Sequence, residues 1–573
     1  MTNAQPTLLL HGGTVRACDG RTPGAEALVI RNGHVAGLGS TDDMRALAGS
    51  GATRIDLRGG TVMPGFVDTH PHLFHFGALA APLVDLADAR DFDDIVARIR
   101  AKAAETPQGA WVMTTPVGEP HYFLRRSWRD LAEGKLPDRY VLDRASTEHP
   151  VYFQAWGPTT PNICVFNSAA LAQLGLDRDA PDHPSTRVWI EKDGSGELTG
   201  RLRGSVNTYY TGDPWMNELL TKIPILQPEA ALEGTKRAMN DYHRMGVTTV
   251  YEGHAMGQAE IGAYQLLRAE GALQVRVLTA LESEQYSMPW DAPLSNDEFR
   301  ANLAAAKAMT ATSDELLRHD GVTLSRGGPC MPGFLRMHEP YWGPYGESTR
   351  GVTFVSEEKE EIALAWCAEN DLRLNFIGGG YRDHDDFLAR AERQHARTSL
   401  ADRHWILQHN YLCTEEQARR YAALGFEVTT SMSFSWAKGD LMGQRIGPYV
   451  WKDLIPLRRL LDAGLLVSCG SDWGPKNIFE QIQLAETHEF CGSGRRNDDA
   501  AHKVSREEAI LMWTRDAARV LRWDGIGTLA PGSHADLFVV DRDPFTCPLE
   551  ELPAAEVQRT LLGGATVFDA GTL

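Results

Sequence analysis

The chain has 573 residues, which is too long for one simple core, so we expect two or more domains. A formal net charge of −19 argues against nucleic acid or an anionic membrane as a partner. The eight cysteines include no Cys-x-x-Cys pair, and no apolar run reaches the roughly 18 residues of a membrane span. We therefore expect a soluble, cytoplasmic protein that acts on a small molecule.

The two ends of the chain share one sequence pattern. Residues 7–65 alternate short β-rich runs with turns, and Asn32-Gly33 between two apolar runs is a strong hairpin signal. Residues 527–541 and 557–568 repeat this pattern. Because each segment is too small to fold alone, we predict one composite β-sandwich domain from residues 1–62 and 525–573.

An apolar run at residues 62–67 is typical of a buried strand, and it leads into His70-Pro71-His72. Alternate side chains of a strand face the same way, so His70 and His72 project together. Two imidazoles side by side at the end of a strand are a ready pair of ligands for a divalent metal.

The middle of the chain alternates helical and apolar segments. Helical periodicity marks residues 91–105, 228–245, 356–370, 414–424 and 505–522, and apolar runs occupy residues 247–250, 275–281, 372–377, 405–407, 427–430 and 465–468. Repeated β–α units imply a parallel sheet covered by helices. We predict a (β/α)₈ TIM barrel over residues 63–524, with its active site at the carboxyl ends of the strands. An open doubly wound sheet is the alternative, which the lack of a glycine-rich phosphate fingerprint weakens.

Residues 106–226 do not follow this alternation of strands and helices, because they carry many Pro, Trp and Gly residues and several short β-like segments. We interpret them as an insertion beside the barrel mouth, where elements that cover a substrate often lie.

Two further strand ends carry metal-ligating side chains. His409 ends the run 405–409, and Asp472 ends the run 465–472. In a barrel, both point into the same mouth as His70 and His72. Three imidazoles and a carboxylate suit a catalytic Zn²⁺, with Fe²⁺ or Mn²⁺ as alternatives, and leave a position open for water.

The chain resembles the metal-dependent amidohydrolases, in the branch of amidohydrolase family 3 that includes N-substituted formamide deformylases. The matching stretches are 63–72 (MPGFVDTHPH), 166–171 (FNSAAL), 246–250 (GVTTV), 339–341 (EPY), 470–473 (GSDW), 527–532 (GTLAPG) and 535–537 (ADL). They span nearly the whole chain in the family's order. The resemblance implies a hydrolase acting on carbon–nitrogen bonds other than peptide bonds, and a homodimer as the expected assembly.

This chain departs from the family pattern at two ligand positions. The family's lysine on the fourth barrel strand, which bridges two metals, aligns with Thr323. The histidine of the fifth strand has become Asn375, and the aspartate that follows it has become Gly379. Since these losses remove the cage of the second metal, we predict one ion.

Four more residues are candidates near the same strand ends. Glu252 and His254 follow the strand 247–250, where family members commonly carry an acidic residue, so Glu252 is a candidate ligand and His254 a candidate proton carrier. A solvated loop pair is the alternative interpretation. Arg326 and His338, in the loop after the fourth strand, are candidates for binding an anionic or carbonyl group, with ordinary loop-surface residues as the alternative interpretation. Aromatic residues in predicted barrel loops favour an apolar pocket over simple packing, namely Tyr341, Trp342, Tyr345, Phe434, Trp436 and Trp473.

The predicted reaction is hydrolysis of an amide, N-acyl or N-formyl bond of a small, apolar or aromatic substrate. Asp472 accepts a proton from the metal-activated water and passes it to the departing amine. The metal, with Asn375, Arg326 or His254, stabilises the oxyanion. Two alternatives stay open: a non-hydrolytic lyase, such as a hydratase or decarboxylase, on the same scaffold, and a degenerate binding protein without catalysis.

Overall fold

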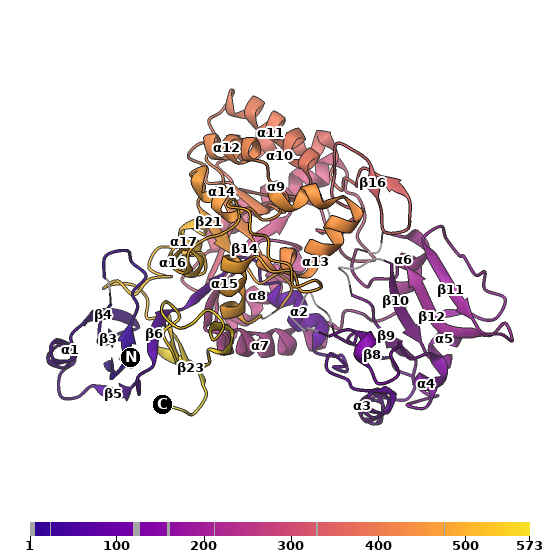
Figure 1. The fold of residues 1–573 in the computed structure, drawn as a ribbon, viewed down its shortest axis with the longest axis horizontal. Helices are drawn as coiled ribbons and strands as arrows, with labels where there is room; N and C mark the ends of the chain where they lie inside the picture. The colour runs from indigo at the N-terminus through magenta and orange to yellow at the C-terminus, as the bar shows by residue number, and fades with distance from the viewer. Residues whose placement is uncertain are drawn as a thin grey trace.

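The structure is a computed structural model that describes residues 6–22, 24–118, 126–156, 161–210, 212–327, 330–474 and 476–573. A barrel of parallel strands and helices occupies its middle (Figure 1). On one side lie two small sheets that contain both ends of the chain, and on the other side lies a five-stranded sheet from residues 112–204.

The barrel confirms the predicted (β/α)₈ fold. Its eight strands all run parallel, and neighbouring strands in the sheet are also neighbours in chain order. The strands are β7 (Phe66–Asp68), β13 (Val247–Glu252), β14 (Arg276–Glu282), β15 (Leu317–Ser325), β18 (Leu374–Gly378), β19 (Ile406–His409), β20 (Glu427–Thr430) and β21 (Val467–Cys469). All eight are nearly continuous buried runs, as a sheet covered on both faces requires.

The first and last strands meet through side chains and loop backbone rather than through a ladder. The Thr69 hydroxyl, just after β7, donates to the Cys469 carbonyl oxygen of β21 at 2.9 Å and lies 2.5 Å from the Thr429 hydroxyl of β20. The Asp472 backbone N–H donates to the His70 carbonyl oxygen at 2.7 Å. This seam therefore brings the two strand ends with candidate ligands together.

Helices cover the outside of the barrel, and their N-termini carry caps that the sequence supplies. Ser295 and Glu298 form a capping box at the start of α9 (Asn296–Met309), and Ser356 caps α10 (Glu357–Glu369). The other helices that follow barrel strands include α2 (Leu73–Ala80), α7 (Pro228–Arg244), α8 (Gln258–Ala269), α11 (Tyr381–His395), α12 (Glu415–Ala423), α13 (Met432–Arg445) and α14 (Leu457–Asp462).

The helix predicted over residues 505–522 is two helices, α16 (Arg506–Leu511) and α17 (Arg515–Val520). The backbone between them accepts hydrogen bonds from barrel strands instead of continuing a helix. The Met512 carbonyl oxygen accepts from the Cys469 N–H at 3.0 Å, and the Trp513 carbonyl oxygen accepts from the Val67 N–H at 2.8 Å. A continuous helix would leave these buried strand N–H groups without partners.

The composite β region consists of two sheets. One pairs β4 (His34–Gly39), β3 (Ala27–Arg31), β1 (Leu8–His11) and β5 (Thr53–Asp56), and the other pairs β2 (Thr14–Val15), β6 (Thr61–Pro64), β22 (Leu537–Val540), β23 (Val557–Leu562) and β24 (Ala565–Asp569). Leu10, Leu28, Val62 and Leu537 pack in one core between them. The two ends of the chain thus share one hydrophobic core, and the exact division at residues 62 and 525 stays a prediction.

The predicted insertion contains a sheet of β11 (Val188–Lys192), β12 (Leu198–Gly204), β10 (Asn162–Phe166), β9 (Val151–Phe153) and β8 (Val112–Thr114). The helix α3 (Phe92–Glu105) packs its Ile95 and Ile99 against Val112 and Val151 of this sheet. Although the predicted boundary of the insertion lies at residue 106, this helix belongs to the same packing unit.

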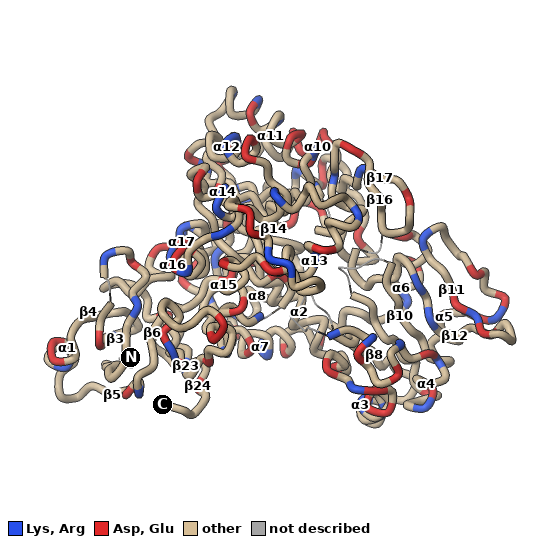
Figure 2. Tube along the Cα trace, viewed as in Figure 1, with Lys and Arg blue, Asp and Glu red and all other residues tan. Residues whose placement is uncertain are grey.

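Acidic and basic residues are interspersed along the barrel helices, the insertion and the composite sheets (Figure 2). No helix in the described part of the chain combines the length and the apolar character that a membrane crossing needs.

Candidate metal centre

Three of the predicted ligands converge at the mouth of the barrel. The Nε2 atoms of His70 and His72 lie 3.0 Å apart, and they lie 3.5 Å and 3.4 Å from Oδ1 of Asp472. Ligand atoms of these three residues all lie within 4.8 Å of one another. All three side chains are buried. This is a compact set of two nitrogen donors and one oxygen donor, a combination that zinc accepts.

The backbone at these positions is in the left-handed region, which non-glycine residues rarely adopt. The φ angle is 50° at His72, 67° at His409, 58° at Asp472 and 55° at Trp473. Each such residue costs of order 1–3 kcal/mol, and such costs are concentrated at functional sites. The strained backbone bends each strand end so that its side chain turns into the site.

Asp68 fixes the two loops that carry the ligands. Its carboxylate accepts from the backbone N–H of His70 at 3.0 Å, from the backbone N–H of Ser471 at 2.9 Å and from the Ser471 hydroxyl at 2.6 Å. One buried side chain therefore ties the His70 loop to the Asp472 loop. On the same side, the Lys476 ammonium donates to the Ser471 carbonyl oxygen at 2.8 Å.

His409 lies beside this set. Its ring stacks on that of His70 with centroids 4.8 Å apart and 15° between the planes, but its nitrogens are not among the ligand atoms within 4.8 Å. The Nδ1 atom of His409 is buried without a hydrogen-bond partner in the described part of the chain. A buried imidazole nitrogen without a partner is a group that a bound cation would satisfy.

A line of amide side chains lies behind His70. The Gln408 amide contacts Nδ1 of His70 at 2.7 Å, and the Asn375 amide donates to Oε1 of Gln408. Asn375 also donates to the Thr323 hydroxyl at 3.0 Å, and Thr323 donates to the Gly253 carbonyl oxygen at 2.6 Å. Asn375 and Thr323 thus form a hydrogen-bonded pair behind the candidate ligands. In this position Asn375 supports Gln408 and, through it, His70, instead of taking its predicted role of binding the oxyanion.

The histidines are disposed to bind a cation. Burial lowers the pKa of His70 and of His409 well below the usual value, and it lowers the pKa of His72 as well. The neighbouring Asp472 acts in the opposite direction on all three. Neutral imidazoles offer free lone pairs, and neutral His is the form that ligates metals. The donor set therefore fits a divalent ion, with His70, His72 and Asp472 as its holders and His409 beside them.

His254 lies at the same mouth. Its ring centroid is 5.3 Å from that of His72 and 5.7 Å from that of His409. Its Nε2 lies 2.9 Å from the Tyr210 hydroxyl, and its Nδ1 lies 3.2 Å from Oε2 of Glu282. Glu282 also accepts from the Ala255 N–H at 2.9 Å, so this carboxylate fixes both the ring and the backbone that carries it.

Glu252, predicted as an additional ligand, is not in the ligand cluster. Its Oε1 accepts from the Phe74 N–H at 2.8 Å and from the Tyr264 hydroxyl at 2.6 Å. Burial raises the pKa of Glu252 to about 7, while these hydrogen bonds act in the opposite direction. The carboxylate therefore holds the first turn of α2, directly after His72, and supports the site from behind.

Arg326, predicted to bind a carbonyl or anionic group, does not face the pocket. Its guanidinium is fully buried and pairs with Glu360, with Asp386 at 3.1 Å and with Asp383 at 3.8 Å. Burial lowers the pKa of Arg326 to about 10, and Asp383 opposes this effect. Its three carboxylate partners lie on α10 and α11, so the Arg326 guanidinium is held between the end of β15 and these helices and not at the candidate metal centre.

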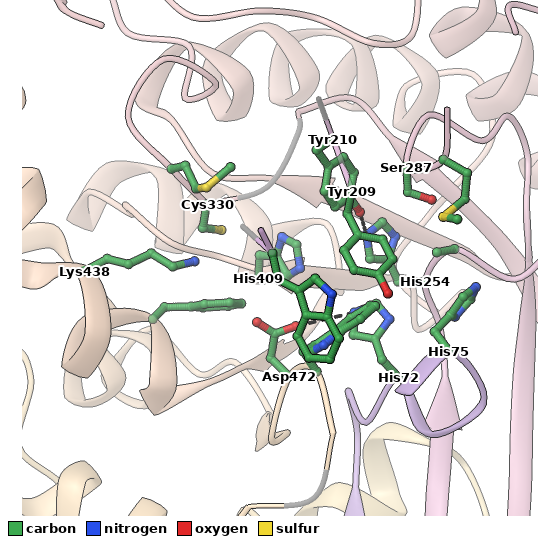
Figure 3. Close-up of a pocket in the computed structure, with 16 residues that line it drawn as sticks. His72, His75, Tyr209, Tyr210, His254, Ser287, Cys330, His409, Lys438 and Asp472 are labelled. Atoms are coloured by element: carbon green, nitrogen blue, oxygen red, sulfur yellow. Dashed lines mark hydrogen bonds and ion pairs between the residues drawn. The ribbon is translucent and has the colours of Figure 1, made fainter. Parts of the chain in front are cut away.

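A pocket opens above the ligands (Figure 3). His72, His254, His409 and Asp472 form its floor, and its walls include Trp156, Tyr209, Tyr210, Met331, Phe434 and Trp473. Trp156 and the two tyrosines come from residues 106–226, so this segment contributes to the pocket walls. Of the aromatic residues predicted to line a pocket, Phe434 and Trp473 do so, whereas the remaining four are absent from its walls: Tyr341, Trp342, Tyr345 and Trp436.

Sequence reasoning missed several side chains at this site. Lys438 and His75 line the pocket, Tyr210 and Glu282 contact His254, and Gln408 contacts His70. Glu282 ends β14 and Gln408 is the last residue but one of β19, so their positions were a usable signal. Tyr210 and Lys438 lie outside the barrel strands, so spacing along the chain gave no signal for these two residues.

An eight-stranded α/β barrel with two histidines and an aspartate clustered at its strand ends defines the class of metal-dependent hydrolases. Residues 53–568 match the model of the amidohydrolase family, so the chain belongs to this family. It is accordingly a hydrolase of carbon–nitrogen bonds other than peptide bonds.

The relatives agree with this assignment. The chain is 26% identical over 585 aligned positions to an N-substituted formamide deformylase from Arthrobacter pascens, covering 98% of each chain. An uncharacterized metal-dependent hydrolase from Pyrococcus furiosus shares the fold at a TM-score of 0.68 and 22% identity, over 94% of this chain and 100% of that one. Atrazine chlorohydrolase from Arthrobacter aurescens, crystallised with zinc, shares the fold at a TM-score of 0.52 and 15% identity, over 98% and 95% of the two chains.

Proposed function

We propose that this amidohydrolase cleaves the N-acyl or N-formyl bond of a small aromatic or apolar amine, with one zinc ion at the barrel mouth. The observation that carries the proposal is the buried cluster of His70, His72 and Asp472, of which His72 and Asp472 line an aromatic pocket. Thr323 and Asn375 hydrogen-bond to each other at the positions where the family carries its second set of ligands, which favours a single ion.

An ion held by His70, His72 and Asp472 would activate water towards a pKa of about 7 and polarise the amide carbonyl. Asp472 accepts the proton of the attacking water at its carboxylate. The same carboxyl group then delivers this proton to the amine nitrogen as the carbon–nitrogen bond breaks. Amines are poor leaving groups unless they are protonated, so this proton transfer is the step that the protein must above all provide.

Tyr210 and His254 are placed to stabilise the oxygen of the tetrahedral intermediate. Burial raises the pKa of Tyr210 well above its ordinary value, so its hydroxyl stays a donor. Glu282 accepts from Nδ1–H of His254, so Nε2 carries the lone pair that holds the Tyr210 hydroxyl at the pocket, and this hydroxyl can turn its single O–H to the developing oxyanion. A preorganised donor of this kind contributes through transition-state electrostatics.

The relative with N-substituted formamide deformylase activity supports the choice of formamides as first substrates. Trp156, Tyr209 and Trp473 pack against one another, with centroids 4.5 Å apart between Tyr209 and Trp473, and they form one aromatic wall. Such a wall suits an aromatic substituent on the amide nitrogen.

The test is elemental analysis of the purified protein beside its His409→Ala variant, followed by a screen of N-substituted formamides. We expect about one zinc per chain in the wild type, a reduced content in the variant, and release of formate and amine in equal amounts. Two ions per chain would contradict the single-ion site. Release of carbon dioxide, or a change of unsaturation without amine release, would point to a lyase, and absence of metal after growth with zinc would point to a degenerate binding protein.

A further inference from the structure

Lys438 is a charged side chain inside the pocket that the proposed reaction does not use. It lies on α13 (Met432–Arg445), only 2% of its surface is exposed, and it lines the pocket with His409 and Asp472. Figure 3 shows its ammonium group directed towards the middle of the pocket. Its contact with the protein is a cation–π contact, with Nζ 5.0 Å from the centre of the Phe434 ring.

The ammonium of Lys438 has no hydrogen-bond acceptor and no carboxylate partner among the described residues. Other buried lysines differ in this respect. Lys359 donates to Glu284 and to the Leu294 carbonyl oxygen, both at 2.6 Å, and Lys476 donates to the Ser471 carbonyl oxygen at 2.8 Å. A buried cation without a partner costs several kcal/mol. At a position open only to the pocket, the natural source of compensation is a bound ligand.

The position of Lys438 follows from the helix that carries it. Phe434 and Lys438 are four residues apart on α13 and so lie on the same face of the helix. Phe434 packs edge-on against His409 with ring centroids 5.1 Å apart, and Nζ of Lys438 lies 5.0 Å from the centre of the same Phe434 ring. The Phe434 ring thus contacts both the cation and His409, so Lys438 shares the pocket with the candidate ligands without being one of them.

We infer that Lys438 binds a carboxylate of the substrate, so that the enzyme acts on N-acyl or N-formyl amines that carry both an aromatic body and an acid group. The inference rests on the proposed function. A single ammonium matches a singly charged carboxylate, whereas phosphate recognition usually uses an arginine fork or several backbone N–H groups. Burial lowers the pKa of Lys438, and an anion in contact with it would favour its charged form, as the nearby Asp472 already does.

Binding measured by calorimetry tests the inference without turnover. The probes are phenylacetate and its neutral isostere phenylacetamide, and the proteins are the zinc-loaded wild type, Lys438→Met and Lys236→Met. Lys236 lies on α7, where it pairs with Glu233, so this control makes the same change of charge away from the site. We expect phenylacetate to bind Lys438→Met about 10- to 100-fold more weakly, with phenylacetamide unchanged and the control like the wild type.

Turnover supplies the second measurement. N-formylphenylalanine and N-formylphenethylamine differ only in the carboxylate. In Lys438→Met, kcat/KM should fall about 10- to 100-fold for the acid, mainly through KM, and stay unchanged for the neutral formamide. Lys438→Arg should recover part of the preference for the acid. Zinc content and thermal unfolding show whether each variant is folded.

The outcomes separate the two proposals. Equal binding of phenylacetate to wild type and Lys438→Met overturns the carboxylate site, because the anion must then sit elsewhere, for instance on the metal. An equal loss of kcat for both formamides also overturns it and makes Lys438 a catalytic proton carrier. If the wild type hydrolyses neither formamide, the proposed function fails, while the calorimetry still decides the role of Lys438.

Discussion

At the scale of single residues, the proposed mechanism gives Asp472 two tasks, because Asp472 completes the candidate ligand cluster and would also move the proton. In Asp472→Asn the amide oxygen can still act as a ligand, but the group no longer accepts a proton. We expect zinc to be retained and kcat for the formamide to fall about 10²- to 10⁴-fold. Metal analysis and initial rates on the same preparation check this, with His70→Ala as the variant that loses zinc. Near-native activity in Asp472→Asn would remove the assigned role.

Two adjacent tyrosines provide a matched pair at this scale. The Tyr210 hydroxyl contacts His254 at 2.9 Å, whereas the Tyr209 hydroxyl is buried without a partner in the described part of the chain. Loss of one donor to a developing oxyanion costs about 10²- to 10³-fold in kcat. We therefore expect Tyr210→Phe to lower kcat by up to this amount and Tyr209→Phe to leave it within about twofold. Equal effects on kcat would exclude a specific role for the Tyr210 hydroxyl.

The sequence predicted the ligands because each stands at a strand end, where parallel strands of a barrel converge. The regular alternation of side chains along a strand could not predict the other residues of the site. Gln408 and His409 are consecutive, yet both contact His70, because the left-handed backbone at His409 turns its ring back into the mouth. The roles of Glu252 and Asn375 depend on partners from distant segments, which spacing along the chain cannot reveal.

At the scale of elements, the seam between β7 and β21 rests on Thr69. Its hydroxyl joins the Thr429 hydroxyl, the Ser468 hydroxyl and the Cys469 carbonyl oxygen. Thr69→Val keeps the shape but removes one hydrogen bond from each of these buried groups, which costs about 1–3 kcal/mol in total. We expect a lower midpoint of thermal unfolding and weaker zinc binding, because His70 is the next residue.

Thr249 on β13 is the control for this change. It is equally buried, but its hydroxyl has no partner among the described residues. Replacing a buried unsatisfied hydroxyl by a methyl group of the same shape removes a cost, so Thr249→Val should be neutral or stabilising. A drop in the unfolding midpoint as large as that of Thr69→Val would show that the loss comes from valine packing and not from the hydrogen bonds.

Local sequence signals predicted those elements whose conformation depends only on residues adjacent in the chain. Asn32 and Gly33 have φ angles of 50° and 76°, so the predicted hairpin turn forms with both central residues in the left-handed region. The break between α16 and α17 was not predicted, because the helical periodicity of residues 505–522 is real and the reason for the break lies in strands β7 and β21.

At the scale of the whole molecule, buried neutral histidines should make the protein sensitive to acid. Burial lowers the pKa of His384 to about 4 and that of His488 to about 3. Each ring takes up a proton on unfolding below its unfolded pKa of about 6.5, so the stability that these groups supply is complete above that pH and is lost as pH falls towards 4. At pH 5 this amounts to about 2 kcal/mol for each residue.

Both histidines lie outside the metal centre, so the effect can be separated from metal loss. We expect the midpoint of thermal unfolding to fall between pH 7 and pH 5, and to fall less in the double variant His384→Gln, His488→Asn. Each protein is compared with itself at the two pH values, which cancels the packing cost of the substitutions. The same fall in both proteins would assign the acid sensitivity to other groups.

The pairing of β6 with β22 has a consequence for synthesis. Pro64 pairs with Leu537 and Thr61 with Val540, so one edge of the amino-terminal sheet stays bare until almost the entire chain has left the ribosome. At about 5–20 residues per second this takes roughly half a minute to a minute and a half. During that time β6 pairs only with the two-residue strand β2, so its other edge is a bare apolar strand edge close to the His70 loop, and a chain that stops early never covers it. Shortened translation products should therefore be the aggregating species, and a chaperone that shields β6 should raise the yield of intact enzyme.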